Sequence, residues 1–285
     1  MRKFVLFAAF CFYVSLGDVV RSQEPQPPQG TQFNTGADPK TEAKLELNRG
    51  VEAFREGRHD TATLAFQRAK QLDPQLLEAR LYLAATYASE YIPGAASEEN
   101  HSFGERSVEE FKGALAIDPN NLNALDGIGS VLFQMAGMPY KPEMFLESKD
   151  CFLKHIRIKP EDPEPYYWVG VIDWTLSFRG NAELRAKYNE EHIHRQVRDT
   201  EPLPELVRSE YARQFGAAIE EGIESLKKAT GLRPDYDDAM AYLNLLYRRK
   251  ADIAGSKAER EQFLKMADDL VDRVMEIKKK RASQP

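Results

Sequence analysis

Residues 111–119 read FKGALAIDP, and the same spacing of apolar, small and proline positions occurs three more times. The other copies are FQRAKQLDP at 66–74, FLKHIRIKP at 152–160 and LKKATGLRP at 226–234. A helical pattern restarts five residues after each closing proline, at Ala79, Ala124, Pro165 and Ala239. Recurrence of this kind is typical of stacked units that bury a shared core. The sequence therefore predicts an all-α chain made of repeated helix pairs.

The spacing resembles the tetratricopeptide repeat, a helix–turn–helix unit of about 34 residues. Residues 43–76 match this unit without a gap, at Gly50, Ala53, Gly57, Ala62, Phe66, Ala69 and Pro74. Gly50 and Ala62 fall where the two helices cross, because small side chains let backbones approach closely. The equivalent pairs in later units are Ala84 with Ser107, Gly129 with Ser148, Gly170 with Gly222, and Asn244 with Ala267. The resemblance implies a right-handed α-solenoid of about five helix pairs.

The predicted solenoid spans residues 42–281, followed by a short disordered tail at 282–285. Its units lie near 43–76, 77–121, 122–162, 163–236 and 237–281. Units two to five exceed the usual length, and their additions fall between the paired helices at 91–105, 137–145, 174–222 and 251–262. The largest addition predicts a helix at 181–197, a break at Pro202 and Pro204, and a second helix at 205–230. Additions at one kind of turn gather on one edge of a solenoid, which is often the functional edge.

The first residues have the layout of a secretory signal. Arg2 and Lys3 precede an apolar run at 4–16, which is short for a membrane span. This pattern predicts a signal peptide at 1–22, cleaved before Gln23 or before Asp18, with an uncleaved membrane anchor as the alternative. The Gln- and Pro-rich stretch at 23–41 predicts a flexible tether. Together with the resemblance, the signal predicts a protein of the bacterial periplasm or cell surface, and eukaryotic secretion is the other reading.

Charge and cysteine content narrow the partner classes. Without residues 1–22 the chain has 36 basic and 44 acidic side chains, a net charge of −8. This balance disfavours nucleic acid and anionic membranes as partners. Cys151 is then the one remaining cysteine, so no disulfide can form within the chain. Its place in a helical pattern beside Phe152 predicts a small buried side chain.

In tetratricopeptide-repeat proteins the first helix of each unit lines a concave groove. Transfer of the groove positions to this sequence gives the predicted partner-binding residues Leu47, Val51, Phe54, Phe133, Gln134, Tyr167, Val171 and Trp174. Leu47 and Val51 stand where a clamp for a C-terminal carboxylate requires polar side chains, so such a clamp is not expected. Two arrangements are compatible with the aromatic residues: an open groove for a partner, or a core that the long addition covers by folding back.

Catalytic and metal-binding patterns are weak. His192 and His194 point in different directions on a helix, whereas Glu190 and His194 share a face, and two ligands do not close a metal site. The sequence has no glycine-rich phosphate loop and no nucleophile elbow. We therefore expect no cofactor, no metal and no enzymatic activity. The predicted function is a scaffold or assembly adaptor that binds a partner peptide or helix. The alternatives are a self-associating structural subunit, and a small-ligand binder or enzyme whose site lies between residues 175–221 and the groove.

Overall fold

The computed structural model describes residues 38–198 and 201–283. The predicted signal peptide and all but the end of the predicted tether lie outside these described residues. From Pro39 onward the chain is one compact unit. Its helices are α1 (Pro39–Arg55), α2 (His59–Leu72), α3 (Leu77–Glu90), α4 (Glu98–Ile117), α5 (Leu122–Gly137), α6 (Pro142–Ile158), α7 (Pro163–Glu191), α8 (Glu205–Leu232), α9 (Asp237–Ile253) and α10 (Lys257–Ala282).

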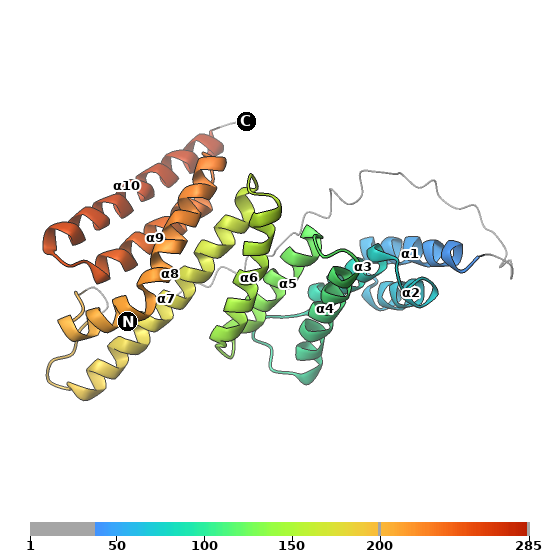
Figure 1. The fold of residues 1–285 in the computed structure, drawn as a ribbon, viewed down its shortest axis with the longest axis horizontal. Coiled ribbons are helices and arrows are strands. Elements are labelled where there is room, and N and C mark those ends of the chain that lie inside the picture. The colour runs from blue at the N-terminus through green and yellow to red at the C-terminus, as the bar shows by residue number, and fades with distance from the viewer. Residues whose placement is uncertain (1–37, 199–200, 284–285) are drawn as a thin grey trace. The chain divides into compact units, whose positions relative to one another are not determined.

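The helices pack in sequential pairs, α1 with α2 through α9 with α10, and the second helix of each pair packs on the first helix of the next (Figure 1). The first helices also touch one another, α1 with α3, α3 with α5, and α7 with α9. Each pair therefore contacts mainly its neighbours, which is the arrangement of an α-solenoid. The predicted fold class, an all-α solenoid of five helix pairs, is confirmed.

Small side chains at the predicted crossings allow hydrogen bonds between paired helices. The Ser107 hydroxyl donates to the carbonyl of Ala84 at 2.9 Å, and the Ser148 hydroxyl donates to the carbonyl of Gly129 at 2.7 Å. A Cβ atom on Gly129 would lie 2.7 Å from the Phe152 ring, which is closer than side chains pack. The repeated phrase thus supplies the large apolar residue that fills the space beside each crossing.

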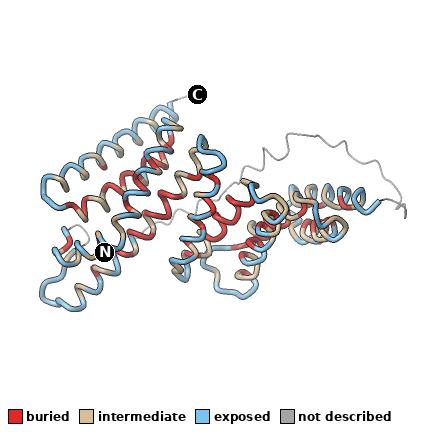
Figure 2. The backbone as a smooth tube through the Cα atoms, in the orientation of Figure 1, coloured by how far each residue is buried: buried red, intermediate tan, exposed pale blue. Residues whose placement is uncertain are grey.

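In the last pair, Asn244 occupies the position that is small in the other pairs. Its Nδ2 atom donates to the carbonyl of Ala267 at 3.1 Å, so a buried amide replaces close packing with a hydrogen bond. Buried residues line the faces where helices meet (Figure 2). Cys151 is one of them, and burial raises the pKa of its thiol to about 11. The prediction of Cys151 as a small core side chain is confirmed.

The long addition in the fourth unit lengthens both paired helices. The helix predicted at 181–197 is wrong at both ends: residues 181–191 continue α7 without a break, and residues 192–198 are not helical. Residues 181–191 extend α7 because this part of the helix packs closely along α8. A Cβ atom on Gly180 would meet the Phe215 ring of α8. The break at Pro202 and the following helix, α8, are confirmed.

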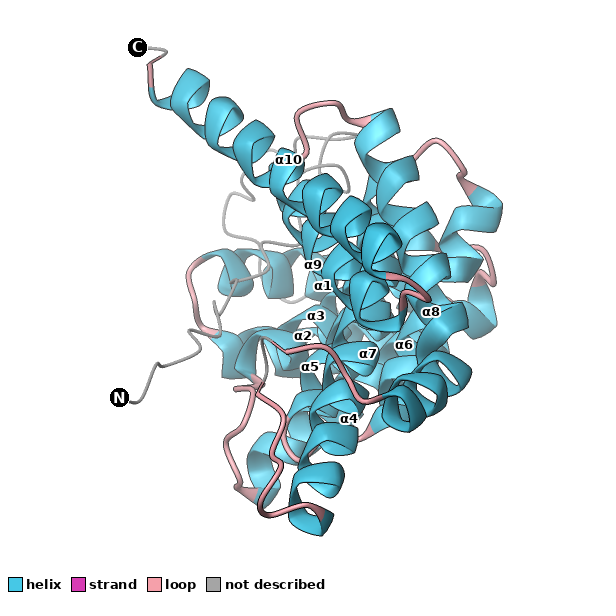
Figure 3. Cartoon of the chain, turned by 90° about the vertical axis from the view of Figure 1, so that its left-hand side faces the viewer, coloured by secondary structure: helices cyan, strands magenta, loops and turns pink. Residues whose placement is uncertain are grey.

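The addition in the fifth unit likewise becomes helix, because only residues 254–256 separate α9 from α10. The second and third units keep true loops at 91–97 and 138–141. Across the described residues the structure consists of helices and loops without strands (Figure 3). Within the same residues, no helix combines the length and the apolar character that crossing a membrane requires.

Candidate functional site

The first helices of the five pairs are α1, α3, α5, α7 and α9, and the predicted partner-binding residues lie on three of them, α1, α5 and α7. We call their partly exposed side chains the first-helix face. Seven of the eight predicted residues are half-buried there: Leu47, Val51, Phe54, Phe133, Gln134, Tyr167 and Trp174. Val171 is only 2% exposed, so it offers no contact area and leaves the predicted set. For the other seven, partner binding stays a prediction.

Tyr167 and Trp174 of α7 are brought together by Tyr242 of α9, with ring centroids 5.7 and 5.3 Å from that ring. Phe178 stacks on Trp174 at 5.2 Å, and Tyr236 lies 5.2 Å from Tyr167. The three α7 residues are seven and four positions apart, a spacing that places them along one side of a helix. We call these five residues the aromatic cluster.

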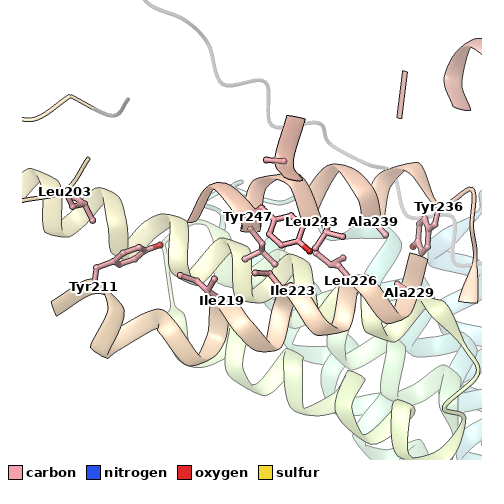
Figure 4. Close-up of a cluster of buried hydrophobic side chains, with 12 residues drawn as sticks. Leu203, Tyr211, Ile219, Ile223, Leu226, Ala229, Tyr236, Ala239, Leu243 and Tyr247 are labelled. Atoms are coloured by element: carbon pink, nitrogen blue, oxygen red, sulfur yellow. The ribbon is translucent and has the colours of Figure 1, made fainter. Parts of the chain in front are cut away.

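The aromatic cluster lies on a rigid support. Its tyrosines and tryptophan pack against a core made mainly of buried side chains from α8 and α9. Figure 4 shows the side chains of this core. Leu226 and Leu243 of this core are 0% and 4% exposed, and the Tyr236 ring is itself part of it. Phe178, by contrast, is 40% exposed. The cluster is thus a half-buried surface whose inner side is fixed and whose outer side is accessible.

Of the two arrangements compatible with the sequence, the described residues do not show the one in which a folded-back insertion covers these aromatics. The insertion continues α7 and α8, and Tyr167 and Trp174 are partly covered by α9 instead. Phe178 is the insertion's one contribution to the cluster. Because it stacks beside Trp174 and stays exposed, it extends the apolar surface and does not close it.

The other predicted residues lie outside the aromatic cluster. Phe133 of α5 packs edge-on against Phe145 and Trp168, with centroids 5.2 and 5.3 Å apart. Phe54 of α1 packs edge-on against His59 at 5.6 Å. Trp168 in turn lies 5.2 Å from Tyr167, so Phe133 adjoins the aromatic cluster through that ring, whereas the ring contact of Phe54 is with His59.

A carboxylate marks one end of the aromatic cluster. Glu164, in the first turn of α7, accepts a hydrogen bond from the Tyr236 hydroxyl at 2.7 Å and pairs with Arg233 at 2.8 Å. Burial, and then the nearby Glu164 charge, raise the pKa of Tyr236 well above its usual value. The phenol is consequently a fixed donor. Burial also raises the pKa of Tyr167.

A guanidinium marks the other end. The Cζ atom of Arg249 lies 5.8 Å from the centre of the Phe178 ring, within reach of a weak cation–π contact. Arg249 also pairs with the buried Asp252 at 3.2 Å, and Asn181 of α7 donates to the same carboxylate at 3.4 Å. An ion pair therefore lies at each end of the aromatic surface, Glu164 with Arg233 and Arg249 with Asp252.

Sequence reasoning missed Tyr242, Tyr236 and Phe178. Tyr242 is not among the groove positions that were transferred from the repeat. Phe178 follows the last transferred position of α7, where the insertion interrupts the repeat pattern. The run of aromatics from Tyr166 to Trp168 was a signal for the region, but the partner ring on α9 required the structure.

The predicted lack of a metal site rests on the sequence. Within residues 38–198 and 201–283, no three His, Cys, Asp or Glu side chains gather closely enough to hold a metal ion. His192 lies just past the end of α7 and stacks on Tyr188, with ring centroids 4.1 Å apart. His192 and His194 are both exposed, and both lie beyond the end of α7.

Comparisons with known proteins bear on the fold. No family model matches the chain, and no curated protein matches its sequence. Among solved structures, MamA from Desulfovibrio magneticus RS-1 superposes with a TM-score of 0.55 at 18% identity, covering 86% of this chain and 98% of that one. A second MamA structure gives 0.54 at 15% identity, with 82% and 94% covered. YrrB, described as a TPR protein with an unusual peptide-binding site, gives 0.50 at 13% identity, with 84% and 92% covered. Likeness at this level of identity establishes a common fold.

Proposed function

We propose that this chain, which has the tetratricopeptide-repeat fold, is a non-catalytic scaffold that binds a peptide or helix of a partner protein on its first-helix face. The observation that carries the proposal is the aromatic cluster, with Phe178 exposed and Trp174 half-buried beside it. Large rings supply much contact area and are favoured as interface anchors. Since the core holds them in place, binding requires little ordering of the surface.

The arrangement of the cluster supports a linear partner, because its three α7 rings follow one side of the helix. A segment lying along them would run from the Glu164–Arg233 pair to the Arg249–Asp252 pair. The solved structure of YrrB, described as having a peptide-binding site, supports a peptide as the class of ligand.

The proposed place of action is outside the cytoplasm, in the bacterial periplasm or at the cell surface. Its support is the sequence alone: the basic start, the apolar run at 4–16 and the polar stretch after it. The acidic balance of the remaining chain supports a protein partner over nucleic acid. Mass spectrometry of the protein from an exporting host tests this point. A mature chain that begins at Gln23 or Asp18 is expected, and a retained Met1 in a soluble cytoplasmic protein would contradict export.

Photo-crosslinking in cells tests the binding proposal. A photoreactive residue at Phe178 replaces an exposed ring of the aromatic cluster. The matched control places the same residue at Leu64 of α2, which is 67% exposed and lies on a second helix. We expect position 178 to crosslink to one dominant foreign protein, which mass spectrometry identifies. This adduct should be lost when Trp174→Ala is introduced as well.

Two other outcomes decide against this reading. Adducts only with a second copy of the chain would favour the alternative of a self-associating subunit. Adducts that are the same from positions 178 and 64 would show that the first-helix face has no special partner. In either case, the scaffold proposal at this face fails.

A further inference from the structure

Helix α10 leaves one of its faces uncovered. In the described structure it packs extensively on α9 alone, whereas α4, α6 and α8 each pack on the helix before and the helix after them. Val271 lies four residues after the small crossing residue Ala267, the place that Phe66, Phe111, Phe152 and Leu226 take in the other pairs. Those four side chains are at most 6% exposed, but Val271 is 37% exposed.

The four buried side chains differ from Val271 in the helix that covers them. Phe66 stacks on Tyr82 of α3 with ring centroids 5.4 Å apart, and Phe152 stacks on Trp168 of α7 at 5.7 Å. In both cases, the first helix of the next pair covers the large side chain. Within the described residues, no helix covers α10 in this way. The face around Val271 is therefore the surface on which one more helix can pack.

The uncovered face carries side chains that are spaced alternately by four and three residues. We call them the outer stripe, and they are Leu264, Asp268, Val271, Met275, Lys278 and Ala282. This spacing lines them up along one side of the helix, as in the seam of a two-stranded coiled coil. Met275 is 59% exposed and Leu264 is half-buried. Because the outermost helix of a solenoid normally presents a polar outer face, these apolar side chains indicate a contact surface.

The outer stripe is complementary to itself when its direction is reversed about Arg273. Its members form three pairs that lie equally far from that residue on either side: Val271 and Met275, Asp268 and Lys278, Leu264 and Ala282. Two antiparallel α10 helices would thus place the apolar Val271 of one copy against Met275 of the other. They would also place Asp268 against Lys278 twice, once on each side of the axis. A two-fold interface requires self-complementarity of this kind.

We propose that the outer stripe binds the outer stripe of a second copy of this chain, with the two α10 helices antiparallel about a two-fold axis beside Arg273. Charge complementarity identifies the occupant, because each end of the stripe meets the opposite charge only in the reversed copy. The outer stripe and the aromatic cluster lie on different helices. The inference therefore goes beyond the proposed function and stands apart from it.

The two charged members of the outer stripe are free to pair across the interface. Asp268 pairs with Arg248 of α9 through Oδ1 at 2.7 Å, and the Asp268 side chain is still 67% exposed. The charge of Lys278 reaches Asp238 of α9, but within the described residues this exposed lysine forms no ion pair. A second cation can therefore approach Asp268, and a carboxylate can approach Lys278.

The charges beside the outer stripe limit how tightly two copies bind. The adjoining positions are Lys265, Asp272 and Lys279, and Lys265 pairs with Asp269 of its own helix at 2.7 Å. Asp272 lies next to the axis, so the Asp272 carboxylates of the two copies would approach and repel each other. The stripe is also only about five helical turns long. We therefore expect a small interface and a dimer whose Kd lies in the micromolar range.

Sedimentation of the protein purified from an exporting host tests the proposal. A monomer–dimer equilibrium is expected over micromolar concentrations. Met275→Glu should weaken it at least about tenfold, because a charge would lie against Val271 of the facing copy. Met138→Glu is the matched control: Met138 is 67% exposed but lies in the α5–α6 loop, so this variant should dimerise normally. Asp272→Asn should strengthen the dimer by roughly two- to fivefold, since it removes the repulsion beside the axis.

Charge exchange tests the antiparallel direction. Asp268→Lys and Lys278→Asp should each weaken the dimer, because each places like charges together twice. An equimolar mixture of these two variants should associate, because opposite charges then face each other in the mixed dimer. The double variant Asp268→Lys, Lys278→Asp should also dimerise. Association of the mixture shows in addition that both variants are folded.

Several outcomes would overturn the proposal. A protein that stays monomeric is one, and a dimer that resists Met275→Glu is another. Two single charge variants that dimerise as well as the natural protein, or a mixture that fails to associate, would rule out the antiparallel pairing. A photoreactive residue at Met275 should crosslink in cells to a second copy. One dominant foreign protein at that position would overturn the second copy as occupant and leave the proposed binding at Phe178 untouched.

Discussion

Lys149 of α6 reaches the fully buried carboxylate of Asp173 on α7, with Nζ 2.8 Å from Oδ1. The other oxygen, Oδ2, has no hydrogen-bond partner. A second acid on α8, Glu221, lies 2.9 Å from the same Nζ atom. One lysine therefore joins the third helix pair to both helices of the long fourth pair, and it is the main compensation for a buried charge at their crossing.

The first prediction is that Lys149→Met lowers the free energy of unfolding by about 3 kcal/mol, because it leaves the Asp173 carboxylate buried without its cation. Urea denaturation at about pH 8 measures this loss. Lys154→Met, on an exposed face of the same helix, should change stability by less than about 0.5 kcal/mol. Adding Asp173→Asn to Lys149→Met should recover part of the loss. Equal stability of the two lysine variants would show that the pair has little energetic weight.

The second prediction concerns pH. Burial raises the pKa of Asp173 from 3.8 to about 7, and the attraction of Lys149 only partly offsets this effect. Between pH 3.8 and about pH 7, the Asp173 carboxyl is therefore protonated to a greater extent in the folded chain than in the unfolded chain. The contribution of Asp173 to the free energy of unfolding therefore falls as pH rises through that window. The pKa of Lys149 is raised, so it titrates above the window and does not alter the sign.

Asp173→Asn isolates this contribution because it cannot titrate. The free energy of unfolding of the natural protein, minus that of Asp173→Asn, should fall by on the order of 3 kcal/mol between about pH 4.5 and pH 7.5. Urea denaturation of both proteins at the two pH values gives the difference. A difference that rises with pH would mean that Lys149 holds the pKa of Asp173 below 3.8.

The third prediction distinguishes an aromatic-cluster ring that stabilises the fold, Trp174, from one that is exposed for binding, Phe178. Trp174→Ala should lower the free energy of unfolding by about 2 kcal/mol, because the half-buried ring packs on Tyr242 and on the core below it. Phe178→Ala should cost less than about 1 kcal/mol, since 40% of that residue is exposed. Thermal or urea denaturation measures both. A loss above about 4 kcal/mol for Phe178→Ala would mark the cluster as ordinary core.

The fold could be predicted because the residues that pack together at each helix crossing belong to the same repeated unit. The large residue of each repeated phrase fills the space at a helix crossing: Phe66 lies against Gly50, Phe152 against Gly129, and Leu226 against Gly170. In each case, the small residue and the large one belong to the same unit. The pattern of apolar, small and proline positions therefore determines the packing within each pair, and the pairs then stack on one another.

Only part of the candidate site could be predicted, because it depends on contacts between residues of different repeat units. Trp174 and Tyr167 were found from the repeat, but their partner Tyr242 lies beyond an insertion of 40 residues whose path has no repeat pattern. The pairing of Lys149 with Asp173 was missed for a different reason: it depends on how α6 lies against α7, and the sequence shows only two charged residues among many. Phe178 and Arg179 lie where α7 runs past its expected end.

The fourth prediction concerns how closely α7 and α8 approach each other, and it compares two glycines in helix interiors, Gly170 and Gly216. A Cβ atom on Gly170 would collide with the Leu226 side chain of α8, whereas the nearest atom to a Cβ on Gly216 is 4.0 Å away. Alanine normally favours a helix over glycine, so Gly216→Ala should raise the free energy of unfolding by about 0.5–1 kcal/mol. Gly170→Ala should lower it by about 2 kcal/mol, because α7 and α8 must separate to admit a methyl group. Urea denaturation measures both, and a gain in stability for Gly170→Ala would show that Leu226 can move aside and that close approach is not what glycine provides there.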